Sequence, residues 1–141
     1  MVTGAFADLC VADVGASIAF YCDLLGLTVR MDHGWYAELG TADRTLLALV
    51  QHGHETVPVG AGAPPRGVLV SFEVDDAAAV ATRAAEMQAP SLLGLVRELG
   101  QRHFMVADPD GAVVDVIEPV PLTGPDLRRL AKLRRAARRS S

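Results

Sequence analysis

Asp115 is the residue whose chemistry fits its surroundings least. It interrupts the run from Val113 to Ile117, which is otherwise built of β-branched apolar residues and is typical of a core strand. Because side chains alternate between the two faces of a strand, Asp115 shares a face with Val113 and Ile117. A carboxylate on such a face is costly to bury unless it forms a hydrogen bond or an ion pair, or has a function such as contacting a ligand. The sequence leaves two interpretations open: a structural acid satisfied by Arg102 or a backbone amide, or a residue that contacts a ligand.

Two other polar residues are candidates for the same site. His103 lies in the apolar run before Asp115, and it either faces that carboxylate or lies outside the site. Asp8 alternates with Phe6 in an early strand-like run, and it either borders a site or is an exposed carboxylate at a strand edge.

The remaining histidines and the cysteines do not form a recognisable reactive pattern. His52 and His54 lie in a loop rich in Gly and Pro with no third metal ligand nearby, so we expect a solvated loop. Cys10 and Cys22 lie in apolar segments without metal-type spacing, which predicts two small core residues rather than a disulfide. No serine follows the sharp glycine-flanked turn that exposes a nucleophile.

Trp35 is the one tryptophan, and its neighbour Tyr36 points to the opposite face if both lie in a strand. In a strand, Trp35 would point to the same face as Ala37 and Leu39, whereas Tyr36 would point to the same face as Glu38. This pattern favours Trp35 for stacking on a planar ligand, with filling of the core as the equal alternative.

The elements that position these residues occur twice along the chain. Asp108-Pro109-Asp110-Gly111 predicts a type I turn between two core strands. Placing Asp13 on Asp76 aligns two strand, helix, three-strand patterns about 63 residues apart, and one such unit alone would bury only one face of its sheet. We therefore predict an α+β fold of two βαβββ modules that form a cup-shaped mixed sheet. The predicted ranges are residues 4–51 and 67–119 for the modules, 52–66 for the linker, and 1–119 for the whole domain.

This repeat, with the segments 17–21 and 24–27 and Gly100-Gln101-Arg102 before the last hairpin, resembles the vicinal oxygen chelate superfamily, which includes glyoxalase I, extradiol dioxygenases and bleomycin resistance proteins. In its metal-using members, the resemblance implies four ligands, one each from the first, fourth, fifth and eighth strands. These positions correspond here to Phe6, Ala48, Leu69 and Asp115. Three of the four side chains have no donor atom, so we expect no metal and no other cofactor.

Composition and charge limit the class of protein. Half of the residues are hydrophobic, yet no apolar run approaches the roughly 20 residues that span a bilayer, so we expect a cytoplasmic protein without a membrane partner. Residues 120–141 hold seven basic residues and one acid, and they predict a basic, helical tail of charge +6 beside a body of charge −10. The body is the favoured partner of this tail, and nucleic acid is unlikely because no aromatic residue lies among the arginines.

These observations favour a metal-free protein that binds a hydrophobic or aromatic small molecule, as antibiotic-binding resistance proteins do. The candidate ligand-binding residues are Phe6, Asp8, Trp35, Ala48, Leu69, His103 and Asp115. The alternative is a superfamily enzyme, of lyase, isomerase or dioxygenase type, that uses Asp115 with or without a divalent metal. The resemblance also implies a homodimer.

Overall fold

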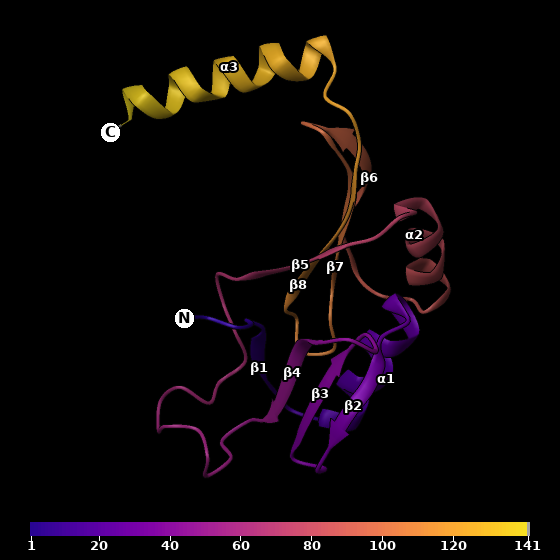
Figure 1. The fold of residues 1–141 in the computed structure, drawn as a ribbon, viewed down its shortest axis with the longest axis vertical. Coiled ribbons are helices and arrows are strands. Elements are labelled where there is room, and N and C mark those ends of the chain that lie inside the picture. Colours follow the sequence, from indigo (N-terminus) through magenta and orange to yellow (C-terminus); the bar gives the residue numbers. More distant parts are fainter. Residues whose placement is uncertain (141) are drawn as a thin grey trace.

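The computed structural model describes residues 1–140 and consists of two βαβββ modules followed by a helix (Figure 1). The α+β fold predicted from the repeat is confirmed. In chain order, the elements are β1 (Ala7–Val11), α1 (Val14–Leu25), β2 (Thr28–Asp32), β3 (Tyr36–Gly40), β4 (Thr45–Gln51), β5 (Leu69–Glu73), α2 (Ala77–Glu86), β6 (Ser91–Glu98), β7 (Gln101–Ala107), β8 (Val113–Pro119) and α3 (Gly124–Arg139).

Each module forms its own four-stranded sheet, and the strand orders are β1-β4-β3-β2 and β5-β8-β7-β6. The first strand of each module is parallel to the last, and the other pairs are antiparallel. Asp8 pairs with Ala48 in the first sheet, and Ser71 pairs with Asp115 in the second. Since Asp8 and Ser71 are 63 residues apart, Ala48 and Asp115 occupy equivalent positions in the two modules.

The helices begin where the sequence repeat predicts. The carboxylates of Asp13 and Asp76 cap α1 and α2 by accepting hydrogen bonds from Ala16 N and Ala79 N, at 2.9 and 3.0 Å. Gly26 ends α1 in the left-handed conformation, with φ 67°, which costs glycine little because it has no Cβ.

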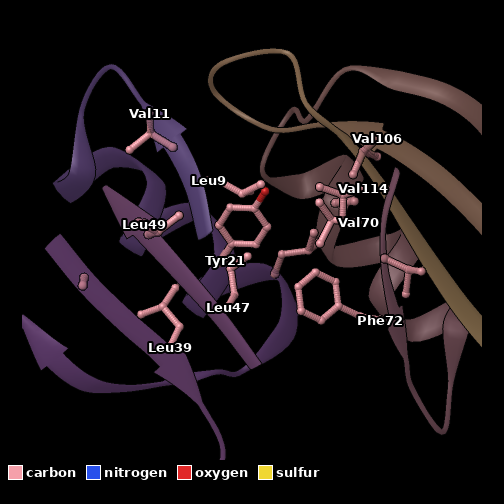
Figure 2. Close-up of a cluster of buried hydrophobic side chains, with 14 of the residues drawn as sticks. Leu9, Val11, Tyr21, Leu39, Leu47, Leu49, Val70, Phe72, Val106 and Val114 are labelled. Atoms are coloured by element: carbon pink, nitrogen blue, oxygen red, sulfur yellow. The ribbon is translucent and has the colours of Figure 1, made fainter. Parts of the chain in front are cut away.

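One face of each sheet is covered by helices and forms the core (Figure 2). The core face carries apolar side chains at alternate strand positions: Leu9, Val11, Ala37, Leu39, Leu47 and Leu49 from the first sheet, and Val70, Phe72, Phe104, Val106, Val114 and Val116 from the second. Strand alternation places the intervening residues on the opposite face, which we call the cup face. Asp8, Tyr36, Glu38 and Ala48 lie on the cup face of the first sheet, and Leu69, Ser71, His103 and Asp115 lie on that of the second.

Polar contacts join the two modules beside this core. Tyr21 from α1 is fully buried, and its hydroxyl donates a 2.7 Å hydrogen bond to Asp108 Oδ2 in the β7–β8 turn. Figure 2 shows Tyr21 between the core residues of the two sheets. Nearby, Ala12 N donates to Asp110 Oδ1 at 3.0 Å. The predicted turn therefore ties the second module to the first as well as closing a hairpin.

α3 (Gly124–Arg139) lies within the tail, residues 120–141, that the sequence predicts to be helical. Thr123 and Asp126 form a capping box, and the buried Asp126 also accepts a 3.0 Å hydrogen bond from Leu99 N. These contacts fix the first turn of α3 to the end of the second sheet. None of the helices within residues 1–140 is long and apolar enough to cross a bilayer.

Candidate functional site

The cup face of the second sheet holds a buried histidine between two carboxylates. His103 lies on β7, where it is 6% exposed, and Asp115 lies on the neighbouring β8, where it is 7% exposed. His103 Nδ1 lies 2.9 Å from Asp115 Oδ1, and its Nε2 lies 3.1 Å from Glu98 Oε1 at the end of β6. His103 therefore faces Asp115 on the cup face and does not lie outside the site.

This arrangement favours the charged form of His103. A neutral imidazole has one N–H group, whereas each ring nitrogen here faces a carboxylate oxygen that can only accept. Burial alone would lower the pKa of His103, but hydrogen bonds to Asp115 and Glu98 and their negative charges outweigh it, so the pKa lies above its ordinary value. A histidine whose pKa is raised by neighbouring carboxylates occurs in both ligand-binding and acid–base sites.

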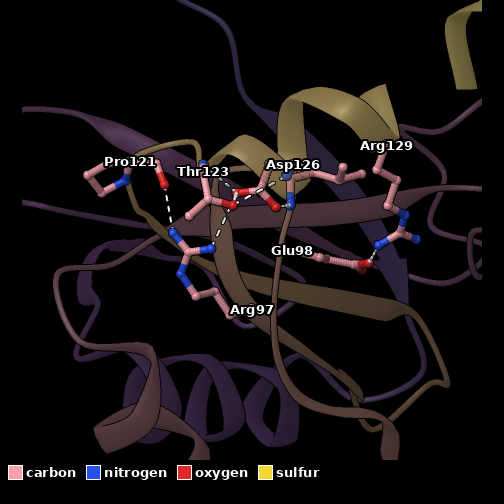
Figure 3. Close-up of polar contacts among 7 residues, drawn as sticks. Arg97, Glu98, Pro121, Thr123, Asp126 and Arg129 are labelled. Atoms are coloured by element: carbon pink, nitrogen blue, oxygen red, sulfur yellow. Dashed lines mark hydrogen bonds and ion pairs between the residues drawn. The ribbon is translucent and has the colours of Figure 1, made fainter. Parts of the chain in front are cut away.

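The chain of polar contacts continues from the cup to α3. Glu98 Oε2 accepts a 2.6 Å hydrogen bond from Arg129 (Figure 3). The hydrogen bonds from His103 and Arg129 lower the pKa of Glu98 below its usual range. Arg102, which was the partner considered for Asp115, instead pairs with Glu118 at 3.2 Å.

A second acidic group lies on the cup face of the first sheet. Asp8 and Glu38 both pair with Ala48, so their side chains flank this small residue on one face. Tyr36 and Thr45 donate hydrogen bonds to the two oxygens of Glu38, each at 2.8 Å. Those bonds lower the pKa of Glu38, whereas burial and then the charge of Glu38 raise the pKa of Asp8. Burial and the bond to Glu38 also raise the pKa of Tyr36 to about 12.

An open groove of about 910 Å³ lies where the modules meet along β5. Exposed Leu46, Val68 and Leu69 contribute apolar surface to its lining. Polar residues accompany them, including Ser71, which pairs with Asp115 in the sheet. The groove therefore combines apolar walls with a few polar groups, as small-molecule sites do.

The four positions that the resemblance assigns to metal ligands differ in exposure. Phe6, just before β1, and Leu69, at the start of β5, are exposed at 48% and 53%. Ala48 is buried and has no donor atom, and Asp115 is engaged by His103. Within residues 1–140, no group of three or more His, Cys, Asp or Glu side chains is arranged to hold a metal ion.

The two alternatives for Trp35 were stacking on a ligand in the cup and filling the core. Ala37 and Leu39, whose side it was expected to share, lie in the core against α1. Trp35 itself precedes β3 and stacks on His54 of the linker, with ring centroids 3.9 Å apart. Tyr36 is the neighbour that lies on the cup face. Ligand binding by Trp35 remains a prediction, but its ring lies against the linker and not in the lining of the groove along β5.

Sequence reasoning missed Glu38 and Glu98 as parts of these clusters. Glu38 gave a signal, because it is a charged residue within an apolar strand in the same way as Asp115. Glu98 gave no such signal in the sequence, because it is the last residue of a strand and does not interrupt an apolar run. Its role depends on the register that brings it beside His103.

The fold and the site define a class of protein. Two βαβββ modules, each with its own four-stranded sheet, have the architecture of the vicinal oxygen chelate superfamily. Comparison with protein families agrees, since residues 4–116 match the Glyoxalase/Bleomycin resistance protein/Dioxygenase superfamily. The chain belongs to this superfamily.

Solved structures share the fold. A protein of unknown function from Agrobacterium tumefaciens str. C58 is 25% identical, with a TM-score of 0.69 over 85% of this chain and 96% of that one. A lactoylglutathione lyase from Agrobacterium tumefaciens is 20% identical, with a TM-score of 0.63 over 83% and 94%. TioX from Micromonospora sp. ML1 is 16% identical, with a TM-score of 0.67 over 83% and 99%. A comparison with curated proteins found no match.

Proposed function

We propose that this protein binds a hydrophobic or aromatic small molecule in the groove along β5, without a metal ion, and sequesters it as antibiotic-binding resistance proteins do. The observation that carries the proposal is the chemistry of the four expected ligand positions. Phe6, Ala48 and Leu69 supply no donor atom, and Asp115 is engaged by His103. A divalent metal needs several N or O ligands, which these side chains do not provide.

The size and lining of the groove support this kind of ligand. Its volume of about 910 Å³ falls within the range of about 300–1,000 Å³ for small-molecule sites. Leu46, Val68 and Leu69 offer apolar surface, while Arg44 and Glu73 lie in the same lining and are positioned to orient polar groups of a ligand.

Leu69→Arg is expected to weaken ligand binding by at least about tenfold, because it places an unpaired charge on apolar surface that a ligand would cover. The measurement is the rise in melting temperature caused by a fluorescent naphthalene sulfonate dye and by a panel of aromatic natural products. Thermal stabilisation is a better readout than Trp35 fluorescence, since Trp35 stacks on the linker.

Val59→Arg is the matched control, because Val59 is equally apolar and fully exposed but lies in the linker. The variant should bind as the wild type does. If no compound raises the melting temperature of the wild type, or if both variants lose binding equally, the groove is not the ligand site.

A second candidate function is an enzyme that uses Asp115. The buried pair of His103 and Asp115 favours it, because such a pair is able to move a proton. The two candidates predict different responses to metal ions. We expect calorimetric titration of metal-stripped protein with Ni²⁺, Mn²⁺, Fe²⁺ or Zn²⁺ to show no stoichiometric binding. Tight binding that is lost in Asp115→Ala would assign the chain to the metalloenzymes of the superfamily.

A further inference from the structure

The apolar side of α3 is exposed in part. Leu127, Leu130 and Leu133 recur every three residues, and Leu127 and Leu133 are 56% and 47% exposed. The residues that join α3 to the sheet, Asp126 and Arg129, lie in its first half. Figure 1 shows the rest of α3 leading away from the second sheet to a free end. Most of the stability of a helix in a protein comes from the packing of its apolar face, so a surface that covers these leucines would stabilise α3.

A complementary surface exists on the second module. A narrow groove of about 210 Å³ lies between α2 and β6. Its lining is apolar and mostly small, and it includes Ala81, Ala85, Ala89, Leu93, Gly94 and Leu95. Small side chains on α2 leave room for the leucines of another helix to approach closely. In Figure 1, α3 extends to the left whereas α2 lies on the right, so α3 points away from the groove of its own chain.

The distribution of charge also favours contact between α3 and the groove beside α2. Seven basic residues and one acid give α3 a charge of +6, so the rest of the chain, which has a net charge of −4 overall, carries −10. The basic residues after Arg129 are exposed. Acidic residues lie exposed at both ends of α2, with Asp75 and Asp76 before it and Glu86 at its last position. A helix lying along α2 would bring opposite charges together at the rim of the groove.

We propose that α3 of one copy docks into the groove between α2 and β6 of a second copy, with its leucines against the alanines of α2. Reciprocal exchange of the helix generates a closed two-fold dimer. The surface lies on the far side of the second sheet from its cup face, so the proposal does not depend on the ligand.

Light scattering of the full-length protein should give twice the chain mass of 14.9 kDa. Leu127→Glu combined with Leu133→Glu should weaken the dimer by at least about tenfold, since both leucines would be central contacts. Ala85→Arg, which fills the groove and repels a basic helix, should do the same. Ala78→Arg is the matched control, because Ala78 is exposed on α2 but does not line the groove, and it should leave the mass unchanged.

A cross-link identifies the contact directly. Ala85→Cys and Ala131→Cys proteins, mixed under mild oxidation, should form a disulfide-linked pair that contains one copy of each, because the partners face each other across the interface. The mixture of Ala78→Cys with Ala131→Cys should form no such disulfide.

A monomeric wild type, or a dimer that survives both the leucine and the Ala85→Arg substitutions, would overturn the proposal. So would a monomer that binds anionic vesicles or duplex DNA through α3, because the helix would then belong to that surface.

Discussion

Replacing Asp108 with alanine is expected to lower the free energy of unfolding by about 3–5 kcal/mol, because several buried donors would lose their acceptor. The carboxylate accepts from the Tyr21 hydroxyl at 2.7 Å, from Asp110 N at 2.9 Å and from Ala112 N at 2.8 Å. Asp108 and Tyr21 are 4% and 0% exposed, so water cannot replace the lost partner without opening the contact between the modules. Urea unfolding of the two proteins measures the difference.

Two further variants distinguish loss of the buried network from general weakening of the turn. Asp110→Ala removes an exposed hydrogen bond from Ala12 N, so it should cost about 1 kcal/mol or less. Tyr21→Phe should cost about 1–2 kcal/mol in the wild type and much less in the Asp108→Ala background, because the two residues act as one unit. Full additivity of the two costs would show that the hydroxyl and the carboxylate are not coupled.

Replacing Asp115 with alanine is expected to destabilise the protein by about 2–4 kcal/mol below pH 6.5, where the substitution leaves a buried imidazolium with one acceptor fewer. The His103 pKa is raised in the folded protein, so the charged pair contributes fully below the unfolded value of about 6.5. That contribution is lost as the pH rises through the raised folded pKa. The difference in stability between wild type and variant should therefore shrink toward high pH.

Nuclear magnetic resonance titration of His103 tests the cause of this pH dependence. The pKa of His103 should fall in Asp115→Asn, which keeps the shape of the side chain and removes its charge. Glu73→Gln is the control, because it removes an exposed carboxylate from the same sheet and should leave the pH dependence unchanged. An unchanged or higher pKa of His103 in Asp115→Asn would contradict the assignment.

The main features of the fold were predictable because they depend on short-range patterns. The capping residues Asp13 and Asp76, the glycine that ends α1 and the turn at Asp108 each act within a few residues. The repeat then implied two modules, since each sheet has one apolar face that must be covered. All strands of the two sheets lie within the predicted module ranges, residues 4–51 and 67–119.

The site was predictable in part. Asp115 stood out because a carboxylate within an apolar strand violates the local pattern, and its partner His103 was among the candidates. The position of Trp35 stayed open between the cup and the core, because alternation along a strand identifies which residues share a face without identifying which face the helices cover. That choice depends on how α1 packs on the sheet, which puts Ala37 and Leu39 in the core.

The sequence by itself determined the elements and their repetition, because these follow from residue types and their spacing. Only the tertiary structure decided that His103 lies between Asp115 and Glu98, that Asp8 and Glu38 flank Ala48, and that α3 leads away from its own body. The physical reason is that these contacts join strands and helices through sheet register and packing. Register and packing are set by the summed burial of many side chains across the molecule, which no local pattern specifies.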